Sequence, residues 1–576
     1  MATSLHVTAH FLRPGATCFN DFLLGAYHPW QVTTCQPVSF IVQKRFSLKT
    51  TTFNNIMSLN KTSHTQQALP AISNSFLFLT ITISGGAVMI LELLGTRIIA
   101  PFYGVSLYVW TALISVTMVA LALGYYLGGF LADRYQRLRL AHVIFLAALT
   151  TVIVPFISGP VLELTNPLGI RGGAFASALI LFTFPLTALA MVGPFVIKLA
   201  TRDLQGVGRM VGSVYAVSTM GSVLGTLLLA FYLLPTFGTR AIIFSLSLLL
   251  LVLSIFLSLR DKEGFPGSWS SMPLLMMGVI SSALAANGYD KPNQPAKDFT
   301  VLHAEEGHYG WVRVVDDERK GFRLLLSDSS VLSAMEIEHG RSLLGYQMVL
   351  GLVPRMFRPT ASQALLIGLG GGHVARDLKA KGLATDTIEI DPVVADMAVK
   401  YFNFTPTGDF IVGDARYEIK KLNKHYDFII HDCFTGGSEP THMLTVEMLT
   451  ELSKLLSEQG VLALNYVGFT NGEGANAVTS VYKTLARTLP NIRVFVTEKG
   501  EFTDFIFLAS KQPLTLDRNN QDKATQWLLD HEYAMTGAGG IVITDDYNPM
   551  ESMQVRKAES YRKIFMERIA PELLLL

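Results

Sequence analysis

A glycine-rich stretch at residues 365–376, LLIGLGGGHVAR, constrains the fold of this chain more than any other. The apolar residues before Gly368 favour a buried parallel strand, and those after Gly372 favour a helix. Glycines let the backbone turn tightly and pass close to a ligand, and the first free N–H groups of the helix point toward that ligand. The stretch therefore predicts a nucleotide-binding turn in which Gly368, Gly370 and Gly372 contact the ligand.

A second apolar segment, TIEID at residues 387–391, follows the glycine turn at the spacing of about 20 residues seen in nucleotide-binding units. A carboxylate at the end of such a strand can accept hydrogen bonds from both hydroxyls of a ribose. A flexible surface turn explains the glycines alone, but not the glycines, the spacing and the acid together. We expect Glu389 to bind the ribose, whereas Asp391 is explained at least as well by a helix cap or a solvated loop.

The chain has 576 residues, of which 50% are hydrophobic and 16% are charged, an apolar share that is high for a soluble protein. The excess is confined to residues 76–289. The net charge of +1 gives no general field that would attract nucleic acid. Cys18, Cys35 and Cys433 are far apart and no HExxH motif occurs, so we expect neither a disulfide framework nor a metal site.

Residues 1–74 are rich in Ser, Thr and Asn and contain Asp21 as their only acid. This composition is typical of a targeting segment, and translation that begins at Met57 explains it equally well. We expect these residues to be an extension outside the folded protein, either disordered or ahead of the mature start.

Residues 75–289 are expected to form a bundle of about seven membrane helices, because stretches close to the length needed to cross a bilayer recur along them. Basic residues follow the second, fourth and sixth stretches, and the positive-inside rule places these turns and the N-terminus in the cytoplasm. The stretches are 76–99, 107–131, 140–158, 174–198, 210–235, 240–259 and a shorter one at 272–287. The basic residues are Arg134, Arg137, Arg139, Lys198, Arg202, Arg260 and Lys262.

The bundle carries features that an anchor alone does not require. Glu92 and Arg97 are ionisable groups at membrane depth, where such groups usually face a cavity or a partner. The stretch GFLADR at residues 129–134 resembles the loop motif between the second and third helices of major facilitator transporters, so the bundle could move a solute. Glycines at a spacing that allows close helix packing are Gly124, Gly128, Gly221 and Gly225.

The rest of the chain has the pattern of a soluble α/β protein. Residues 290–300 are polar with two prolines and predict a linker. Residues 301–335 predict a small β-subdomain containing a hairpin, since two alternating segments lie there. Strands alternate with helices over 336–576, which indicates a doubly wound parallel sheet whose ligands bind beyond the carboxyl ends of the strands.

Three acids fall at such carboxyl ends. Glu389 closes the second strand, Asp414 follows the third in GDARYEI, and Asp432 follows the fourth, YDFIIH. Each acid alone is explained by a loop or a helix cap. Because the strands deliver all three to one edge of the sheet together with the glycine turn, we expect them to form one site.

At these residues the chain resembles the spermidine synthase (polyamine aminopropyltransferase) family, in a form fused to an N-terminal multi-span region. The resemblance covers residues 300–550 and implies a Rossmann-like, methyltransferase-type domain with a small N-terminal β-subdomain. It implies decarboxylated S-adenosylmethionine as co-substrate and no prosthetic group. The implied roles are ribose binding for Glu389, adenine binding for Asp414 and Ala415, substrate binding for Tyr346, and proton acceptance in catalysis for Asp432.

The chemistry suits these roles. An amine with a pKa near about 10 is protonated at neutral pH and has no lone pair with which to attack. A strand-end carboxylate can hold the cation, take its proton and leave a nucleophile aimed at the carbon beside the sulfonium. The sulfur leaves as a neutral thioether, so alignment of the two reactants should supply much of the rate.

The sequence also departs from the family pattern. Gly371 stands where the GGGDGG motif has its Asp, the second substrate-side Asp falls on Thr435, and Leu332 replaces a donor-binding Gln. We therefore expect a retained donor half and an acceptor half with one carboxylate instead of three. The segment TDDYNPME resembles the C-terminal part of membrane-fused relatives, and its Asp545 and Asp546 either restore negative charge or lie in a solvated turn.

Three functions follow from these observations. The first is a membrane-anchored aminopropyltransferase acting on an amine such as putrescine. A homodimer is compatible with this function, and nucleic acid is not an expected partner. The second is an S-adenosylmethionine-dependent methyltransferase, since the same glycines fit that motif. The third is a polyamine transporter or sensor without turnover. On chemical grounds we expect a cytoplasmic synthase-like domain, which requires the segment 272–287 to be interfacial, because seven spans would place that domain outside.

Overall fold

The computed structural model describes residues 73–260 and 298–569 together with Leu573, apart from short gaps at 105, 136, 202–205, 435–436, 517–521 and 536–537. These residues belong to one compact unit, residues 68–576. The expected extension, except for its last two residues, and the expected span 272–287 lie outside the described residues.

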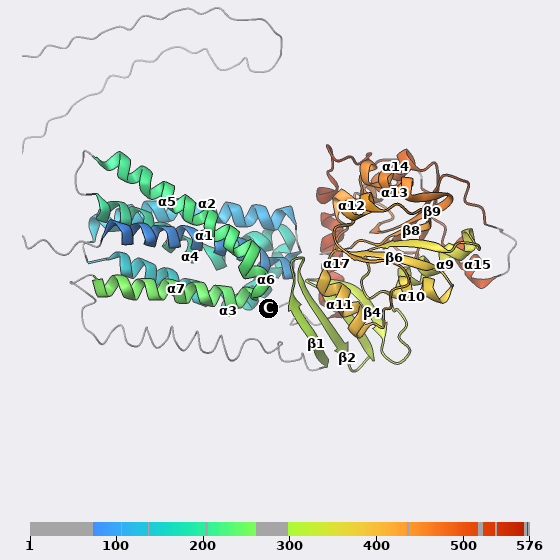
Figure 1. Cartoon of the computed structure of the whole chain (residues 1–576), viewed down its shortest axis with the longest axis horizontal. Coiled ribbons are helices and arrows are strands. Elements are labelled where there is room, and N and C mark those ends of the chain that lie inside the picture. Colours follow the sequence, from blue (N-terminus) through green and yellow to red (C-terminus); the bar gives the residue numbers. More distant parts are fainter. Residues whose placement is uncertain are drawn as a thin grey trace, which may run out of the picture. The chain divides into compact units, whose positions relative to one another are not determined.

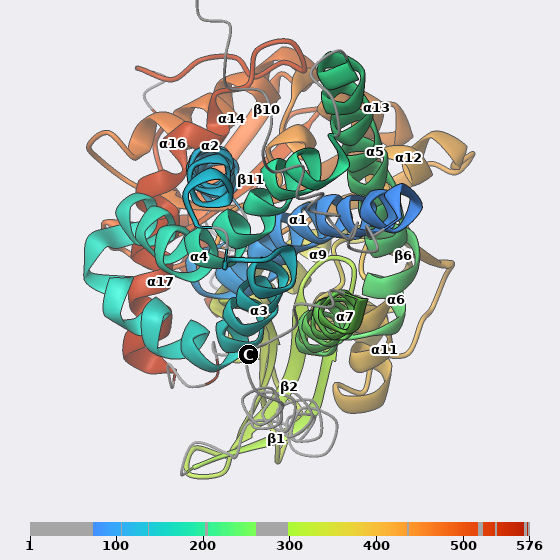
Figure 2. The same ribbon diagram turned by 90° about the vertical axis from the view of Figure 1, so that its left-hand side faces the viewer.

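Long helices make up the N-terminal half of this unit. They pack pairwise, α1 against α5 and α4, α2 against α4, and α3 against α4 and α7 (Figure 2). The helices are α1 (Asn74–Tyr103), α2 (Leu107–Arg134), α3 (Leu140–Thr165), α4 (Gly169–Ala200), α5 (Val207–Leu228) and α7 (Thr239–Arg260). Shorter turns are η1 (Asn166–Leu168), η3 (Leu229–Leu233) and α6 (Leu234–Thr236).

The predicted close-packing glycines lie at helix contacts. A Cβ added at Gly124 of α2 would lie 2.4 Å from the Cβ of Ala190 of α4, and one at Gly221 of α5 would lie 2.1 Å from the carbonyl oxygen of Thr82 of α1. Larger side chains would force these backbones apart. The small-residue faces predicted from the sequence are therefore confirmed as contacts.

Five stretches of the described residues are long and apolar enough to cross a membrane, and one of them, Leu140–Ala200, contains both α3 and α4. Large apolar side chains face outward on α2 and α5, such as Tyr126 and Leu224, which are 72% and 55% exposed. An outward apolar face is typical of a helix that contacts lipid.

The two ends of the bundle differ. The N-terminal ends of α2 and α7 contact the C-terminal region, through Leu107 and Thr239 respectively. These helices then run for 28 and 22 residues, about 40 and 30 Å at 1.5 Å per residue, to Arg134 and Arg260. Arg134 and Arg260, two of the basic residues predicted to lie at cytoplasmic turns, therefore lie at the end of the bundle away from the C-terminal region.

A four-stranded antiparallel sheet begins the C-terminal region, in the order β1-β2-β3-β4. The predicted hairpin is present as β2 and β3. One face of the sheet packs on α11, with Val312 and Val314 of the sheet in the same apolar cluster as Met397 of the helix. The strands are β1 (Phe299–Glu306), β2 (Trp311–Asp317), β3 (Phe322–Ser327) and β4 (Ser330–Glu336).

A seven-stranded sheet follows, in the order β10-β11-β9-β8-β5-β6-β7 (Figure 1). The five strands from β9 to β7 are parallel, as predicted. The strands are β5 (Gln363–Ile367), β6 (Ala384–Glu389), β7 (Phe410–Val412), β8 (Tyr426–His431), β9 (Leu456–Phe469), β10 (Asn491–Val496) and β11 (Phe502–Ser510).

The prediction of an all-parallel sheet was wrong for one strand, β11, whereas β10 runs in the same direction as β9. β11 runs antiparallel to both β9 and β10. Only residues 497–501 separate β10 from β11, and a parallel pair would need a long crossover, usually a helix. The short turn therefore imposes the antiparallel direction.

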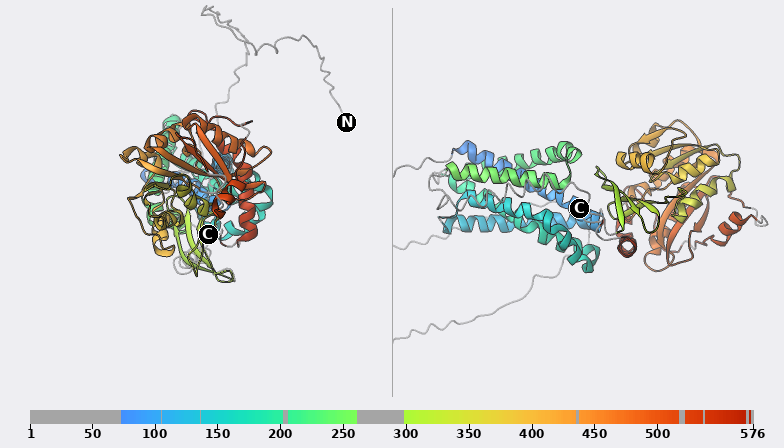
Figure 3. Two further views of the ribbon diagram at one scale, coloured as in Figure 1. Left: turned by 90° about the vertical axis from the view of Figure 1, so that its right-hand side faces the viewer. Right: turned by 90° about the horizontal axis from the view of Figure 1, so that it is seen from below.

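Helices cover both faces of this sheet, which confirms the doubly wound arrangement (Figure 3). Side chains of α13 and α14 pack on one face, and those of α9, α10 and α15 on the other. The helices are α9 (Gly345–Phe357), α10 (His373–Ala380), α11 (Pro392–Tyr401), α12 (Ala415–Glu418), α13 (Val446–Leu455), α14 (Ala475–Thr488), α15 (Lys523–Asp530), α16 (Met550–Met553) and α17 (Val555–Arg568). Two 3-10 turns are η4 (Ile419–Lys421) and η5 (Thr441–Met443).

Candidate active site

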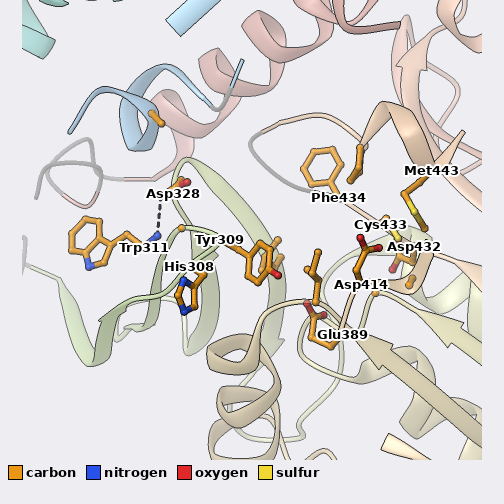
Figure 4. Close-up of a pocket in the computed structure, with 18 of the residues that line it drawn as sticks. His308, Tyr309, Trp311, Asp328, Glu389, Asp414, Asp432, Cys433, Phe434 and Met443 are labelled. Atoms are coloured by element: carbon orange, nitrogen blue, oxygen red, sulfur yellow. Dashed lines mark hydrogen bonds between the residues drawn. The ribbon is translucent and has the colours of Figure 1, made fainter. Parts of the chain in front are cut away.

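A cavity of about 520 Å³ lies beyond the carboxyl ends of the parallel strands. Its volume is in the range of small-molecule sites. Figure 4 shows Glu389, Asp414 and Asp432 gathered at one end of it. The lining contains every predicted site residue except Gly372: Gly368, Gly370, Tyr346, Glu389, Asp414, Ala415 and Asp432.

The glycine turn has the conformation that its residues predict. Gly368, Gly370 and Gly372 have φ angles of 87°, 51° and 76°, which non-glycine residues rarely adopt. A Cβ at Gly368 would lie 2.1 Å from the carbonyl oxygen of Asp432, so the turn presses against the end of β8. Gly372 forms the N-cap of α10 and lies behind the cavity wall, where it shapes the turn rather than lining the cavity.

Glu389 joins β6 to the glycine turn. Its Oε2 accepts the N–H of Leu369 at 2.9 Å and its Oε1 accepts the N–H of Asp391 at 3.0 Å. Burial raises the pKa of this carboxyl group, although these backbone donors oppose the rise. Each carboxylate oxygen retains a second lone pair, so Glu389 can also accept hydrogen bonds from a ligand's hydroxyl groups.

Asp391 and Asp414, which follow β6 and β7, both cap helices, but only one of the two lines the cavity. Asp391 accepts the N–H of Val393 at 2.9 Å and caps α11, as its alternative explanation requires. Asp414 caps α12 by accepting the N–H of Arg416 at 2.8 Å, yet it also lines the cavity beside Ala415. Of these two acids, Asp414 lines the cavity and Asp391 does not.

Asp432 is the predicted proton acceptor. Its Oδ1 accepts a hydrogen bond from Asn465 of β9 at 3.0 Å. Burial raises its pKa to about 7, and the negative charges of Asp504 and Glu439 act in the same direction, while bonds from Asn465 and Tyr346 oppose the shift. A carboxyl group with this pKa exists in both protonation states near neutral pH, as a proton acceptor requires.

Residues 343–497 match the family model described as the spermine/spermidine synthase domain. The C-terminal region therefore contains a spermidine synthase domain. Residues 298–576 are called the synthase domain below. Members of this family use decarboxylated S-adenosylmethionine as co-substrate, without a prosthetic group.

Relatives with two different activities match the chain. A polyamine aminopropyltransferase of Vibrio vulnificus is 43% identical over 117 residues, which are 19% of this chain and 39% of the relative. An N-terminal histidine N-methyltransferase of Emericella nidulans is 27% identical over 400 residues, which are 64% of this chain and 69% of the relative. Both are transferases, and the chain is a transferase as well.

A polyamine aminopropyltransferase of Oceanobacillus iheyensis also matches over most of the chain, with 23% identity over 387 residues, 62% of this chain and 72% of the relative. Among solved structures, a probable spermidine synthase from Corynebacterium glutamicum covers 45% of this chain and 94% of its own, with 17% identity and a TM-score of 0.35.

Two carboxyl groups that the sequence did not single out lie near Asp432. Asp504 of β11 and Glu439 both act electrostatically on it. Burial raises the pKa of Asp504 to about 6. Glu439 is buried, forms an ion pair with Lys557 of α17 and accepts the N–H of Val467 at 2.9 Å. Neither Asp504 nor Glu439 belongs to the cavity lining, so Asp432 remains the carboxylate expected in the acceptor half, with Asp504 and Glu439 behind it.

The remaining departures from the family pattern have different outcomes. A Cβ at Gly371 would lie 2.6 Å from Ser333 Oγ, so the glycine turn has no room for the Asp of the family motif. Leu332 lines the cavity, whereas Thr435 lies outside the described residues. Asp545 forms an ion pair with Arg416, and Asp546 is exposed, so the segment fits a solvated turn rather than added charge in the cavity.

Proposed function

We propose that this chain transfers an aminopropyl group from decarboxylated S-adenosylmethionine to an amine, with putrescine as the default acceptor. The observation that carries this proposal is Asp432, whose carboxyl group has a pKa of about 7 and whose carbonyl oxygen borders the glycine turn. In this arrangement one strand end holds the proton acceptor beside the donor-binding turn.

The donor is assigned to the strand ends. Glu389 accepts hydrogen bonds from the ribose hydroxyls, and Asp414 with Ala415 contacts the adenine. The backbone at Gly368 and Gly370 approaches the sulfonium side of the nucleoside closely because neither residue has a side chain. Alignment of this donor with the acceptor nitrogen supplies much of the rate, since the thioether leaves without needing a proton.

The acceptor is assigned to the carboxyl groups around Asp432. An incoming ammonium is attracted by Asp432 and Asp504, and its positive charge lowers the pKa values of these acids. Asp432 then takes one proton from the ammonium. The free amine attacks the carbon next to the sulfonium, a C–N bond forms, the C–S bond breaks and methylthioadenosine leaves.

Methyl transfer from S-adenosylmethionine is a second candidate, supported by Gly371. An aminopropyl donor ends in an ammonium, which the missing Asp of the family motif would bind. S-adenosylmethionine, unlike its decarboxylated form, carries a carboxylate at that end. The backbone N–H groups of a glycine turn can donate hydrogen bonds to this carboxylate. The 400-residue match to a histidine N-methyltransferase supports the same candidate.

Product analysis separates these reactions. Purified full-length protein is incubated with each donor and either putrescine or a tripeptide that begins with histidine. Methylthioadenosine release supports aminopropyl transfer, and S-adenosylhomocysteine release supports methyl transfer. Asp432→Asn should lower kcat by about 100- to 10,000-fold with little change in donor Kd. Donor binding without either product, and unaffected by Asp432→Asn, would instead support the sensor alternative.

We also propose that the bundle spans a bilayer. The support is its five long apolar stretches and the outward apolar side chains on α2 and α5. Extraction tests this directly, because a spanning protein stays with membranes in alkaline carbonate and is released by detergent. Release by carbonate alone would contradict the proposal.

A further inference from the structure

The helical bundle reaches the cavity that contains Asp432. Arg97 of α1 and Trp110 of α2 belong to its lining, together with Glu389 and Asp432 of the synthase domain. The proposed reaction uses groups at the strand ends only. The proposed reaction therefore leaves the function of Arg97 and Trp110 in this cavity unexplained.

Arg97 holds a turn of the synthase domain. Its Nη1 donates to the carbonyl oxygen of Gly307 at 2.8 Å and its Nη2 donates to that of His308 at 2.7 Å. The turn is closed by the N–H of Gly307, which donates to the carbonyl of Gly310 at 2.8 Å. A guanidinium presents its N–H groups in a rigid fork, so bonds to two consecutive carbonyls fix the orientation of the turn.

A second helix of the bundle holds the strand that leads into this turn. Glu306 Oε2 accepts the backbone N–H of Thr239 at 2.8 Å and its hydroxyl at 2.7 Å, and Thr239 begins α7. On the far side of the turn, Asp328 accepts the N–H of Trp311 at 2.9 Å (Figure 4). The turn between β1 and β2 is thus fixed from the bundle and from within its own sheet.

Aromatic residues of the turn and of the first position of β2 border the cavity, and the ring of Trp311 also packs against the guanidinium of Arg313. His308, Tyr309 and Trp311 all belong to the lining, and Trp110 adds a further ring from α2. Figure 4 shows Tyr309 between the hairpin residues and the strand-end acids. Aromatic faces bury apolar chains and attract ammonium groups.

We propose that Trp110, Tyr309 and Trp311 form the binding wall for the body of the acceptor, with Arg97 as the residue that positions this wall. This inference rests on the proposed function, in which Asp432 deprotonates the acceptor nitrogen. The acceptor class is an amine carried on an extended or aromatic body that reaches from Asp432 past Tyr309. Acceptor specificity then resides partly in the membrane bundle.

The test uses the full-length protein in lipid nanodiscs, with putrescine and a tripeptide that begins with histidine as acceptor probes. Trp110→Ala and Arg97→Lys should each raise the KM of the accepted probe by about tenfold while donor Kd stays within about twofold. Arg97→Lys keeps the charge but loses the fork. Trp110→Phe should restore most of the affinity, and Tyr126→Ala and Arg134→Lys, farther along α2, serve as matched controls.

The outcomes separate this inference from the proposed function. A wild-type protein that binds no adenosyl donor and releases no product overturns the proposed function. Wild-type turnover with unchanged acceptor KM in both Trp110→Ala and Arg97→Lys overturns the acceptor wall alone. A donor Kd that rises as much as the acceptor KM also overturns the wall, because the bundle would then serve the donor or the fold.

Discussion

The carboxyl group of Asp432 has a raised pKa because it is buried among protein atoms and near other acids. Only its deprotonated form can accept a proton, so kcat/KM should fall as the pH drops through about 7. A bound cationic acceptor lowers this pKa, and the acidic limb of kcat should therefore lie at lower pH than that of kcat/KM. Both profiles are measured by product release at saturating donor. Coincident limbs near pH 4 would contradict the raised pKa of Asp432.

Glu389 and Asp391 offer a matched pair for the donor site, two residues apart. Glu389→Gln replaces an acceptor oxygen by an NH₂ group opposite backbone N–H donors, so donor Kd should rise by about 10- to 100-fold. Asp391→Asn keeps a helix cap of similar strength and should leave donor Kd nearly unchanged. Calorimetric titration of each purified variant checks both. Equal losses would place the ribose elsewhere.

At the residue scale, the sequence correctly predicted that the acids at the ends of the parallel strands line one cavity. Glu389, Asp414 and Asp432 each end or follow a parallel strand, and the topology of such sheets brings these ends together. Arg97 and Trp110 could not be assigned to the cavity, because they reach it only through the packing of helices against the synthase domain. The one signal available was that Arg97 is a charged residue inside the first apolar stretch, although the structure places it against the synthase domain and not at membrane depth.

At the scale of elements, the direction of β11 decides the charge of the acceptor site. Asp504 lies near the start of β11 and pairs with Val467 near the end of β9. In a parallel strand the same residue would lie at the opposite edge of the sheet. The sequence-based prediction of parallel strands therefore hid Asp504, whereas the alternation of strands and helices before it was predicted correctly.

Asp504→Asn tests this element. Loss of its negative charge should raise the KM for putrescine by about tenfold, since a buried charged partner is worth roughly 1.5–3 kcal/mol. It should also lower the pKa of Asp432 and shift the acidic limb of kcat/KM to lower pH, because Asp504 raises that pKa. Glu458→Gln, at an exposed position of β9, is the control. An unshifted limb would remove Asp504 from the site.

At the scale of the whole molecule, the basic turns and the synthase domain lie at opposite ends of the bundle. If the bundle spans a bilayer as proposed, the positive-inside rule predicts that the synthase domain lies outside the cytoplasm, whereas donor supply predicts the cytoplasmic side. In right-side-out vesicles, added protease should then cut exposed sites of the synthase domain and leave the turn around Arg134 and Arg139 intact. Protection of the synthase domain would restore the cytoplasmic assignment.

That separation also bears on where the two reactants meet. An enzyme facing away from the cytoplasm would meet its acceptors on the outer side of the membrane, so a small amine such as putrescine would have to be exported before it is modified. The adenosyl donor, made where ATP is available, would first have to be carried across the lipid, and the rate of that passage would limit turnover in the living cell.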